Sequence, residues 1–191
     1  MKKRILSLLI LLSAATATMA YNSILAKLVK TDYEGKADSL TKVFIKEFMN
    51  TSKGTFWVTP RGVNSSNIYI YWQQAHAIDV VIYAYQRNLA AGNKTQANLY
   101  KNYVSKWFQN KGNNYSGGST GFENPYTDDM CWIALTLQRM GEVFNNNTYF
   151  STAKRLFDNG IMSRAKEDEK GLWLPWNTDN GSGPNACTLS P

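Results

Sequence analysis

Apolar side chains recur at helical spacing through most of this chain, and this periodicity is the feature that most constrains its fold. Leu99, Tyr103 and Trp107 follow one another at four-residue steps, and segments before and after them repeat the pattern. The pattern predicts five helices, over residues 37–49, 72–91, 95–110, 128–144 and 149–162. No long segment alternates apolar and polar residues, and residues 173–176 are candidates for a short strand or a loop. We therefore expect an all-α chain whose successive helices pair into αα-hairpins.

The apolar stripes also predict which side chains face the core. In the first helix they are Leu40, Val43, Phe44 and Phe48, and in the last they are Ala153, Leu156, Phe157 and Ile161. Residues 182–191 have the composition of a loop that leads into a further helix, so we expect the chain to be the first part of a longer helical protein.

The first twenty residues have the layout of a secretory signal peptide. A positive start at residues 2–4 precedes an apolar run at residues 5–12, and small residues follow up to Ala20. An uncleaved membrane anchor is the alternative, but the apolar run is shorter than the ~20 residues that a bilayer span needs. We expect cleavage after Ala20, a secreted or periplasmic protein without a stable membrane anchor, and a domain over residues 21–191.

Charge and cysteine content exclude several classes of function. Cleavage would remove three positive charges from a net charge of +7, and the remaining Lys and Arg residues form no basic run, so we expect no nucleic-acid partner. Cys131 and Cys187 could form a disulfide in an oxidising compartment or remain two buried thiols, and both alternatives stay open. Two cysteines far apart with one histidine do not suggest a zinc site, and no cofactor motif is present.

Two consecutive acids, Asp128 and Asp129, stand where the fourth helix is predicted to begin. Helix capping is the simplest interpretation, because Thr127 or an Asp can cap a first turn and an acid there is favoured by the helix dipole. Bulky apolar residues follow at once, however, and a loop with Asn124 and Tyr126 precedes. We therefore expect this turn to be at least half buried beside a loop that can contact a ligand.

Adjacent carboxyl groups on a helix suit one particular chemistry. Successive residues are rotated by about 100°, so their side chains diverge and a ligand can lie between them. Retaining glycoside hydrolysis uses two carboxyls roughly 5–5.5 Å apart, one as nucleophile and one as general acid/base. Mutual repulsion and partial burial would separate their pKa values. The chain also contains six Trp, eleven Tyr and eight Phe residues, which suits stacking on sugar rings as well as a plain core.

The stretch Tyr126-Thr127-Asp128-Asp129-Met130-Cys131-Trp132 resembles the catalytic motif of glycoside hydrolase family 76, the endo-α-1,6-mannanases. Three other stretches resemble family segments in the same order. They are YWQQAHAID at residues 71–79, FENPY at 122–126, and a later region with Trp173, Trp176 and GPNAC at 183–187. Together they extend over most of the mature chain.

The resemblance implies an (α/α)6 barrel, of which this chain would form a partial barrel of helical hairpins that stops roughly halfway round. It implies a retaining endo-α-1,6-mannanase acting on α-mannan without a metal or cofactor, with Asp128 as nucleophile and Asp129 as general acid/base. It also implies a cleft lined by Asn124, Tyr126, Gln73, Gln74, His76, Trp173 and Trp176. For Asp79 we expect a structural hydrogen bond, and for Trp132 a place in the cleft wall or core.

Two functional alternatives remain beside the mannanase. A non-catalytic, carbohydrate-binding half-barrel is compatible with a chain that stops early. Another six-hairpin glycosidase, such as an unsaturated-uronide hydrolase, is less favoured because such enzymes place their acids differently.

Overall fold

The computed structural model describes residues 33–63, 71–111, 118, 120–179 and 183. Contacts divide the chain into two units, Met1–Leu40 and Thr41–Pro191. The described residues of the first unit, 33–40, are helical. All the elements that follow belong to the second unit.

The second unit begins with a helical segment and a small β-ribbon. Residues 41–48 are helical, and β1 (Met49–Asn50) then pairs antiparallel with β2 (Thr55–Phe56). The turn between the strands passes very close to α3 (Lys94–Gln109) at Gly54, where an added Cβ would lie 2.6 Å from the Trp107 backbone nitrogen. Gly54 also has a φ of +75°, which favours glycine. A 3-10 turn, η1 (Pro60–Gly62), follows β2.

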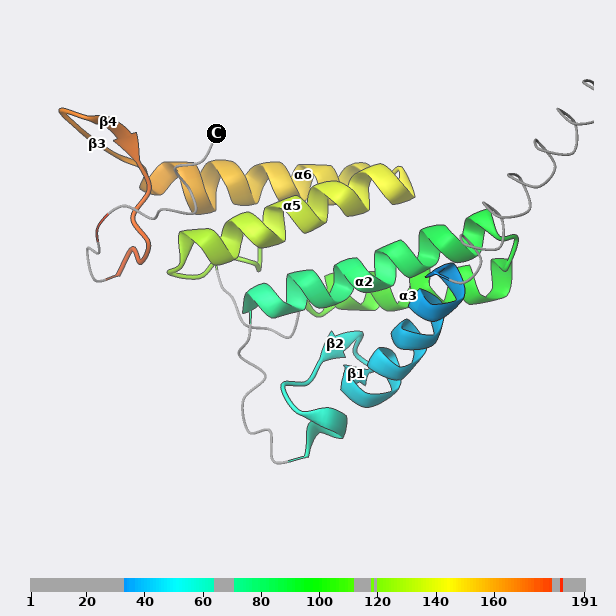
Figure 1. Ribbon diagram of the computed structural model, residues 1–191. Helices are drawn as coiled ribbons and strands as arrows, with labels where there is room; N and C mark the ends of the chain where they lie inside the picture. The colour runs from blue at the N-terminus through cyan, green and yellow to red at the C-terminus, as the bar shows by residue number, and fades with distance from the viewer. Residues whose placement is uncertain (1–32, 64–70, 112–117, 119, 180–182, 184–191) are drawn as a thin grey trace, which may run out of the picture. The chain divides into compact units, whose positions relative to one another are not determined.

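Two helical hairpins form the body of this unit (Figure 1). The first consists of α2 (Tyr71–Ala90) and α3, which pack against each other. The second consists of α5 (Thr127–Phe144) and α6 (Asn147–Arg155), joined by Asn145 in the left-handed conformation. A π-helical segment, η2 (Leu156–Ile161), continues α6, and the 3-10 turn η3 (Met162–Arg164) ends it. A short antiparallel hairpin, β3 (Lys166–Asp168) with β4 (Gly171–Trp173), follows.

The helices α2 and α5 lie side by side and run in the same direction. Their contacts advance together along both helices. His76 meets Trp132, and Asp79, about one turn further along α2, pairs with Arg139, about two turns further along α5. At the beginning of α2, the Tyr71 hydroxyl donates to the carbonyl of Phe122, just before α5. The N-terminal ends of both helices therefore meet at one end of the unit.

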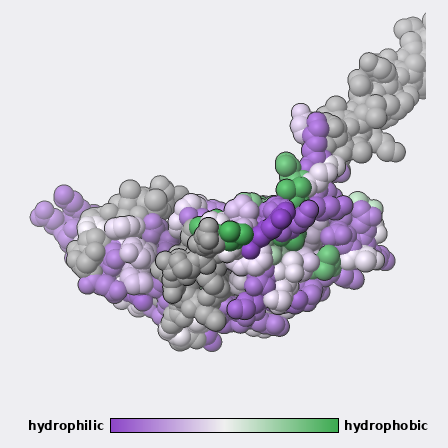
Figure 2. Space-filling model, turned by 90° about the horizontal axis from the view of Figure 1, so that it is seen from below, coloured by the Kyte–Doolittle hydropathy of each residue, from purple (hydrophilic) through white to green (hydrophobic). Residues whose placement is uncertain are grey.

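The core lies between these hairpins and the β1–β2 ribbon. Its largest fully buried side chains come mainly from α2, α3, α5 and η2, with Phe122 from the loop before α5. They include Ile78, Trp107, Met130 and Leu137. On the face shown in Figure 2, hydrophilic residues predominate and hydrophobic residues form small groups. No helix among the described residues is both long and apolar enough to cross a bilayer.

The mostly helical fold predicted from the sequence is confirmed, with two kinds of correction. The first helix ends at residue 48, and the last one changes to π-helical geometry at Leu156. Four side chains expected on buried stripes are instead exposed: Leu40, Val43, Leu99 and Phe157, at 70%, 58%, 41% and 47%. In α3 the buried stripe consists of Ala97, Tyr100, Val104 and Trp107, so Leu99 lies on the other side of that helix.

Candidate active site at the N-terminal end of α5

The two acids lie in the first turn of α5, as the sequence predicts, and both are half-buried. The residue before the helix, Tyr126, is extended and makes no side-chain cap. Instead, Asp128 Oδ1 accepts a hydrogen bond of 3.0 Å from the backbone N–H of Asp129. Asp128 thus satisfies one of the free amides of the first turn, but from inside the helix and not as the predicted cap. The side chain of Asp129 makes no hydrogen bond of this kind to the described residues of the first turn, so capping does not explain its presence.

Asp129 is held from the preceding loop by Asn124. The Asn124 amide Nδ2 donates to Asp129 Oδ2 over 3.0 Å, while Asn124 Oδ1 accepts from the Tyr126 N–H over 2.9 Å. Asn124 is itself buried. It therefore fixes the Asp129 carboxyl relative to the loop rather than lining an open wall.

Burial raises the pKa of Asp129 to about 6 from an ordinary value of 3.8. The hydrogen bond from Asn124 lowers this pKa and the charge of Asp128 raises it, but both effects are smaller than that of burial. The two adjacent acids therefore occupy different environments. One is poised to hold a proton in mildly acidic solution, which is the requirement for a general acid.

A strap formed by residues 175–178 secures the start of α5. Thr127 donates from Oγ1 to the Pro175 carbonyl over 2.6 Å, and its N–H donates to the Trp176 carbonyl over 3.2 Å. The Thr178 N–H donates to the Pro125 carbonyl over 3.0 Å. These bonds join residues about fifty positions apart in sequence. The later Trp-containing region is thereby brought to the acid pair, as the family resemblance implies.

Arg164 in η3 ties the loop and the strap together. Its Nη1 donates to the Asn124 carbonyl over 2.6 Å and lies 3.4 Å from Thr178 Oγ1. The charged guanidinium strengthens these contacts. The sequence interpretation missed Arg164, because a lone Arg forty residues from its partner gives no local signal.

Two groups of aromatic rings belong to segments next to the acid pair. Just before α5 and in the strap, the rings of Tyr126 and Trp176 have centroids 5.3 Å apart, and Trp176 is 47% exposed. Within the helices, His76 on α2 contacts Trp132 at 4.6 Å and Trp72 at 5.6 Å. We call Trp72, His76 and Trp132 the aromatic shelf. Trp132 is 42% exposed, so the expectation of a wall or core residue holds only for the part of its ring against His76.

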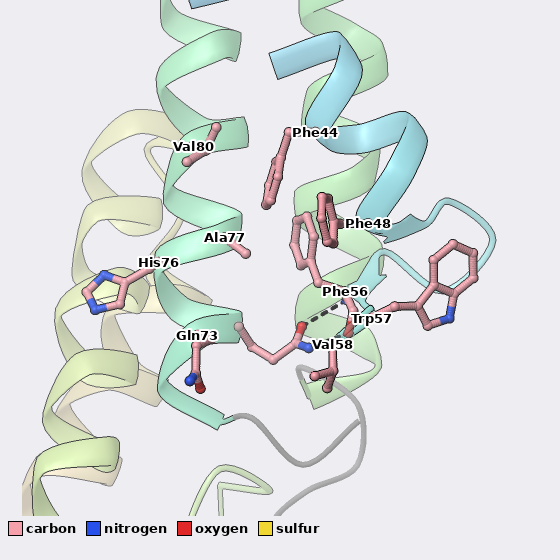
Figure 3. A pocket seen from close by; sticks show the side chains of 10 residues that line it. Phe44, Phe48, Phe56, Trp57, Val58, Gln73, His76, Ala77 and Val80 are labelled. Atoms are coloured by element: carbon pink, nitrogen blue, oxygen red, sulfur yellow. Dashed lines mark hydrogen bonds between the residues drawn. The ribbon is translucent and has the colours of Figure 1, made fainter. Parts of the chain in front are cut away.

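The prediction that Gln74 contacts sugar requires correction. Gln74 is buried, and its amide makes two hydrogen bonds to the backbone of Phe56. The Phe56 N–H donates to Oε1 over 3.0 Å, and Nε2 donates to the Phe56 carbonyl over 2.7 Å (Figure 3). Because this amide is buried and bonded at both ends, Gln74 joins β2 to α2 instead of facing a ligand from solvent.

The remaining predicted residues lie in two places. Gln73 and His76 line a pocket of about 330 Å³ beside the phenylalanines of residues 44, 48 and 56, and no described residue bonds the buried Gln73 Oε1. Trp173, in β4, is half-buried and lies 5.3 Å from the Lys166 ammonium. The expected structural role of Asp79 is confirmed, since it pairs with Arg139. Cys187, residues 1–20 and most of 183–187 lie outside the described residues.

The described residues contain no cluster of three or more His, Cys, Asp or Glu side chains placed to hold a metal ion. What the site offers is a pair of carboxyls with different hydrogen-bond partners and aromatic rings on the neighbouring segments.

No protein-family model matches the chain, and no curated protein matches its sequence. Among solved structures, the fold is similar to that of the GH76A α-1,6-mannanase from Salegentibacter sp. HEL1_6, with a TM-score of 0.60. The two chains are 24% identical, and the match covers 81% of this chain and 41% of that one. The chain thus spans about two-fifths of the length of the structures it matches.

Two further structures of the same mannanase are matched with the same identity and coverage. One is an inactive variant, with two consecutive aspartates replaced by asparagine, in complex with α-1,6-mannotriose, at a TM-score of 0.60. In the other, alanine replaces both aspartates, the ligand is α-1,6-mannotetrose, and the TM-score is 0.61. The resemblance to glycoside hydrolase family 76 predicted from the sequence is therefore confirmed for the fold, which is that of a helical barrel matched over part of its length.

Proposed function

We propose that this chain supplies the catalytic acids of a retaining endo-α-1,6-mannanase. One observation carries the proposal: adjacent acids begin α5, and the second of them has its pKa raised to about 6 while Asn124 holds its carboxyl. The fold likeness to a mannanase that is inactive when two consecutive aspartates are replaced supports the same assignment.

In the first step, Asp128 attacks the anomeric carbon as a carboxylate while the bond from that carbon to the leaving oxygen breaks. Asp129 donates its proton to the leaving oxygen, so the first product departs as a neutral alcohol. A glycosyl ester on Asp128 results. In the second step, Asp129 accepts a proton from water, the water oxygen attacks the same carbon, and Asp128 is released. Two inversions at one carbon retain the α configuration.

The unlike environments of the two acids support this division of roles. A general acid must hold its proton near the working pH, and burial gives Asp129 that property. Asp128 accepts the Asp129 N–H at the positive end of the helix dipole, which favours a carboxylate. We therefore assign attack to Asp128 and proton transfer to Asp129.

The proposed substrate is α-1,6-linked mannan or its oligosaccharides. The matched mannanase was solved with α-1,6-mannotriose and with α-1,6-mannotetrose. The rings of Tyr126 and Trp176 and those of the aromatic shelf offer two stacking surfaces on segments next to the acids, which suits a sugar chain of several units. Such an arrangement favours endo-acting cleavage.

A polysaccharide substrate lies outside the cell, so the mannanase proposal agrees with the export expected from residues 1–20. N-terminal sequencing of the secreted protein tests this, with Tyr21 as the expected first residue.

A carbohydrate-binding helical protein without activity is the second candidate. The observation that favours it is the exposure of Trp72, Trp132 and Trp176, which suits sugar binding with or without cleavage. In that case mannan binds at the same rings but is not cleaved.

Digestion of linear α-1,6-mannan, followed by chromatography of the products, tests the proposal. We expect the wild-type chain to release oligosaccharides, and Asp128→Asn and Asp129→Asn each to lower the rate by at least about 100-fold. Asp158→Asn is the matched control, because that acid pairs with Lys154 in another part of the unit and its loss should leave the rate unchanged.

If Asp128→Asn cleaves as fast as the wild type, the assignment of the nucleophile is wrong. If a folded wild-type chain binds mannan without cleaving it, the second candidate replaces the first.

A further inference from the structure

The aromatic shelf is made by two neighbouring helices rather than by one sequence motif. Trp72 and His76 lie one turn apart on α2, and their rings meet edge to face at 5.6 Å and 79°. His76 also meets Trp132 of α5 at 4.6 Å and 59°. The imidazole is thus in contact with both indoles, and the three rings form one continuous surface across the two helices.

The three rings of the shelf contact one another, but both indoles remain accessible to solvent. Trp72 is 45% exposed and Trp132 is 42% exposed. In Figure 3, His76 projects from the side of α2 away from Phe44 and Phe48, which belong to the apolar pocket. Trp72 and Trp132 do not line that pocket, and the shelf adjoins it through His76, which is part of both.

The position of the shelf relates it to the acids. Trp132 follows Asp128 by four residues and Asp129 by three, so all three side chains lie on neighbouring positions of one helical face. One helical turn is ~5.4 Å along the axis, a length comparable to that of one sugar ring. A ring stacked on Trp132 would therefore adjoin a ring whose linkage lies at the carboxyls.

A second exposed apolar surface differs from the shelf in the residues that line it. A groove of about 590 Å³ lies between α5 and α6, lined mainly by Leu135, Phe150 and Phe157 with smaller side chains. We call it the α5–α6 groove. Its lining includes Gln138 and Lys154 but no carboxyl group, and its rings come with aliphatic neighbours. Of these two surfaces, the shelf is the one that combines exposed indoles with adjacent acids.

On the basis of the proposed function, we propose that the aromatic shelf is a sugar-stacking subsite, which binds the mannosyl residue next to the linkage at Asp128 and Asp129. The indoles of Trp72 and Trp132 supply the stacking faces. His76 is a positioning residue, which holds the two indoles apart at a fixed spacing through its ring.

Three features of the shelf suit this role. An indole offers a large rigid face at low conformational entropy cost, because only two side-chain torsions must be ordered. Contact with His76 restrains both indoles before a ligand arrives, and such preorganisation reduces the cost of binding. The apolar face of a pyranose can then cover the exposed rings while its hydroxyls stay in water or reach the carboxyls.

Calorimetric titration with α-1,6-mannotriose tests the subsite. The variants carry Asp128→Asn so that bound sugar stays intact. We expect Trp132→Ala to weaken mannotriose binding about tenfold or more, and Trp72→Ala to weaken it by a smaller factor. Phe157→Ala, which removes an equally exposed ring from the α5–α6 groove, is the matched control and should leave the affinity unchanged. Thermal melting checks that each variant is folded.

His76 is tested by a pair of substitutions. If its ring spaces the indoles, His76→Phe keeps most of the affinity while His76→Ala loses several-fold. Equal losses in both variants would show instead that an imidazole nitrogen contacts the sugar, and would overturn the positioning role.

The outcomes separate the subsite from the hydrolase proposal. Mannotriose binding that is lost in Trp132→Ala supports the subsite, even where wild-type chain fails to cleave mannan. If the protein with Trp132→Ala binds mannotriose as tightly as the protein that retains Trp132, the subsite proposal is overturned, even where the wild-type chain is an active mannanase. A folded protein that does not bind mannotriose at all overturns it as well.

Discussion

The aromatic rings of the shelf and of the α5–α6 groove are exposed to similar fractions, and α5 contributes to both surfaces. Trp132 belongs to the shelf, and Leu135, less than one turn further along, belongs to the groove. The shelf adjoins two acids whose partners come from a loop and from a strap fifty residues away. The groove has no acid and no such network among its lining residues. Exposure of rings alone therefore does not identify a sugar site; rings beside fixed carboxyls do.

The two surfaces also differ in the interactions that fix the positions of their side chains. At the acid end, Thr127, Asn124 and Arg164 use hydrogen bonds, which fix direction as well as distance. In the groove, side-chain packing determines the shape. We expect substitutions at the acid end to change chemistry, and substitutions in the groove or the core to change stability only.

The largest effect on stability is expected from Gln74, which was predicted to bind sugar. Gln74→Leu leaves the N–H and carbonyl of Phe56 buried without partners, and should lower the free energy of unfolding by about 2–4 kcal/mol. Urea denaturation measures this loss. The folded fraction of the variant should bind mannotriose with the affinity of the wild type. If Gln74→Leu has normal stability but binds mannotriose more weakly, the original prediction that Gln74 contacts sugar is correct.

Asn124→Ala should act on chemistry. Removing the bond to Asp129 frees the carboxyl and is expected to lower mannan turnover by about 10- to 100-fold. Because that bond lowers the pKa of Asp129, its loss should also move the alkaline limb of the pH–rate profile to higher pH. A merely structural role would lower the rate without moving the limb, so an unshifted profile contradicts the assignment.

Gly141→Ala tests the packing beside the groove. An added Cβ at this position would lie 2.7 Å from the ring of Phe150, so α5 and α6 would have to separate or the ring would have to move. We expect a loss of about 1–2 kcal/mol of stability, since overpacking outweighs the better helix propensity of alanine. Mannotriose affinity should not change. Weaker sugar binding in a stable Gly141→Ala protein would mean that the two surfaces are coupled.

The smallest effect is a pH-dependent change in stability. Because folding raises the pKa of Asp129 from 3.8 to about 6, the folded state binds its proton more tightly than the unfolded state does. Stability from this group is present below pH 3.8 and is lost as the pH rises through about 6.

Asp129→Asn should therefore stabilise the protein above pH 6, by about 1 kcal/mol after allowance for solvent around a half-exposed group, and by less at pH 4. Thermal melting at both values measures the difference. A variant that is less stable than the wild type at pH 8 would show that the Asp129 charge is well compensated.

The helices were predictable because their apolar spacing is local. The stripe of Ile133, Leu137 and Met140 is buried in α5, as predicted. Leu99 was misplaced because α3 carries a second run at similar spacing, and only its neighbours α2 and the Gly54 turn decide which face is covered. The strands β1 and β2 have two residues each, too few for an alternating pattern to appear.

The site was predictable where a motif marks it. The acids, Tyr126 and Trp176 came from the family resemblance, and the structure joins them through the strap. Gln74 was misassigned because its direction depends on β2, which the sequence does not signal. The shelf had a signal that was not used: Trp72 and His76 are four residues apart, as are Asp128 and Trp132, and such pairs lie on one helical face.

The anomeric form of the first product tests the central claim most directly. Proton NMR during hydrolysis of α-1,6-mannan by the wild-type chain follows the newly released reducing ends before they mutarotate. Attack by Asp128 followed by water predicts that the α anomer appears first. Initial release of the β anomer would mean that water attacks directly and that Asp128 is not a nucleophile. A folded chain that releases no reducing ends would contradict the hydrolase proposal itself.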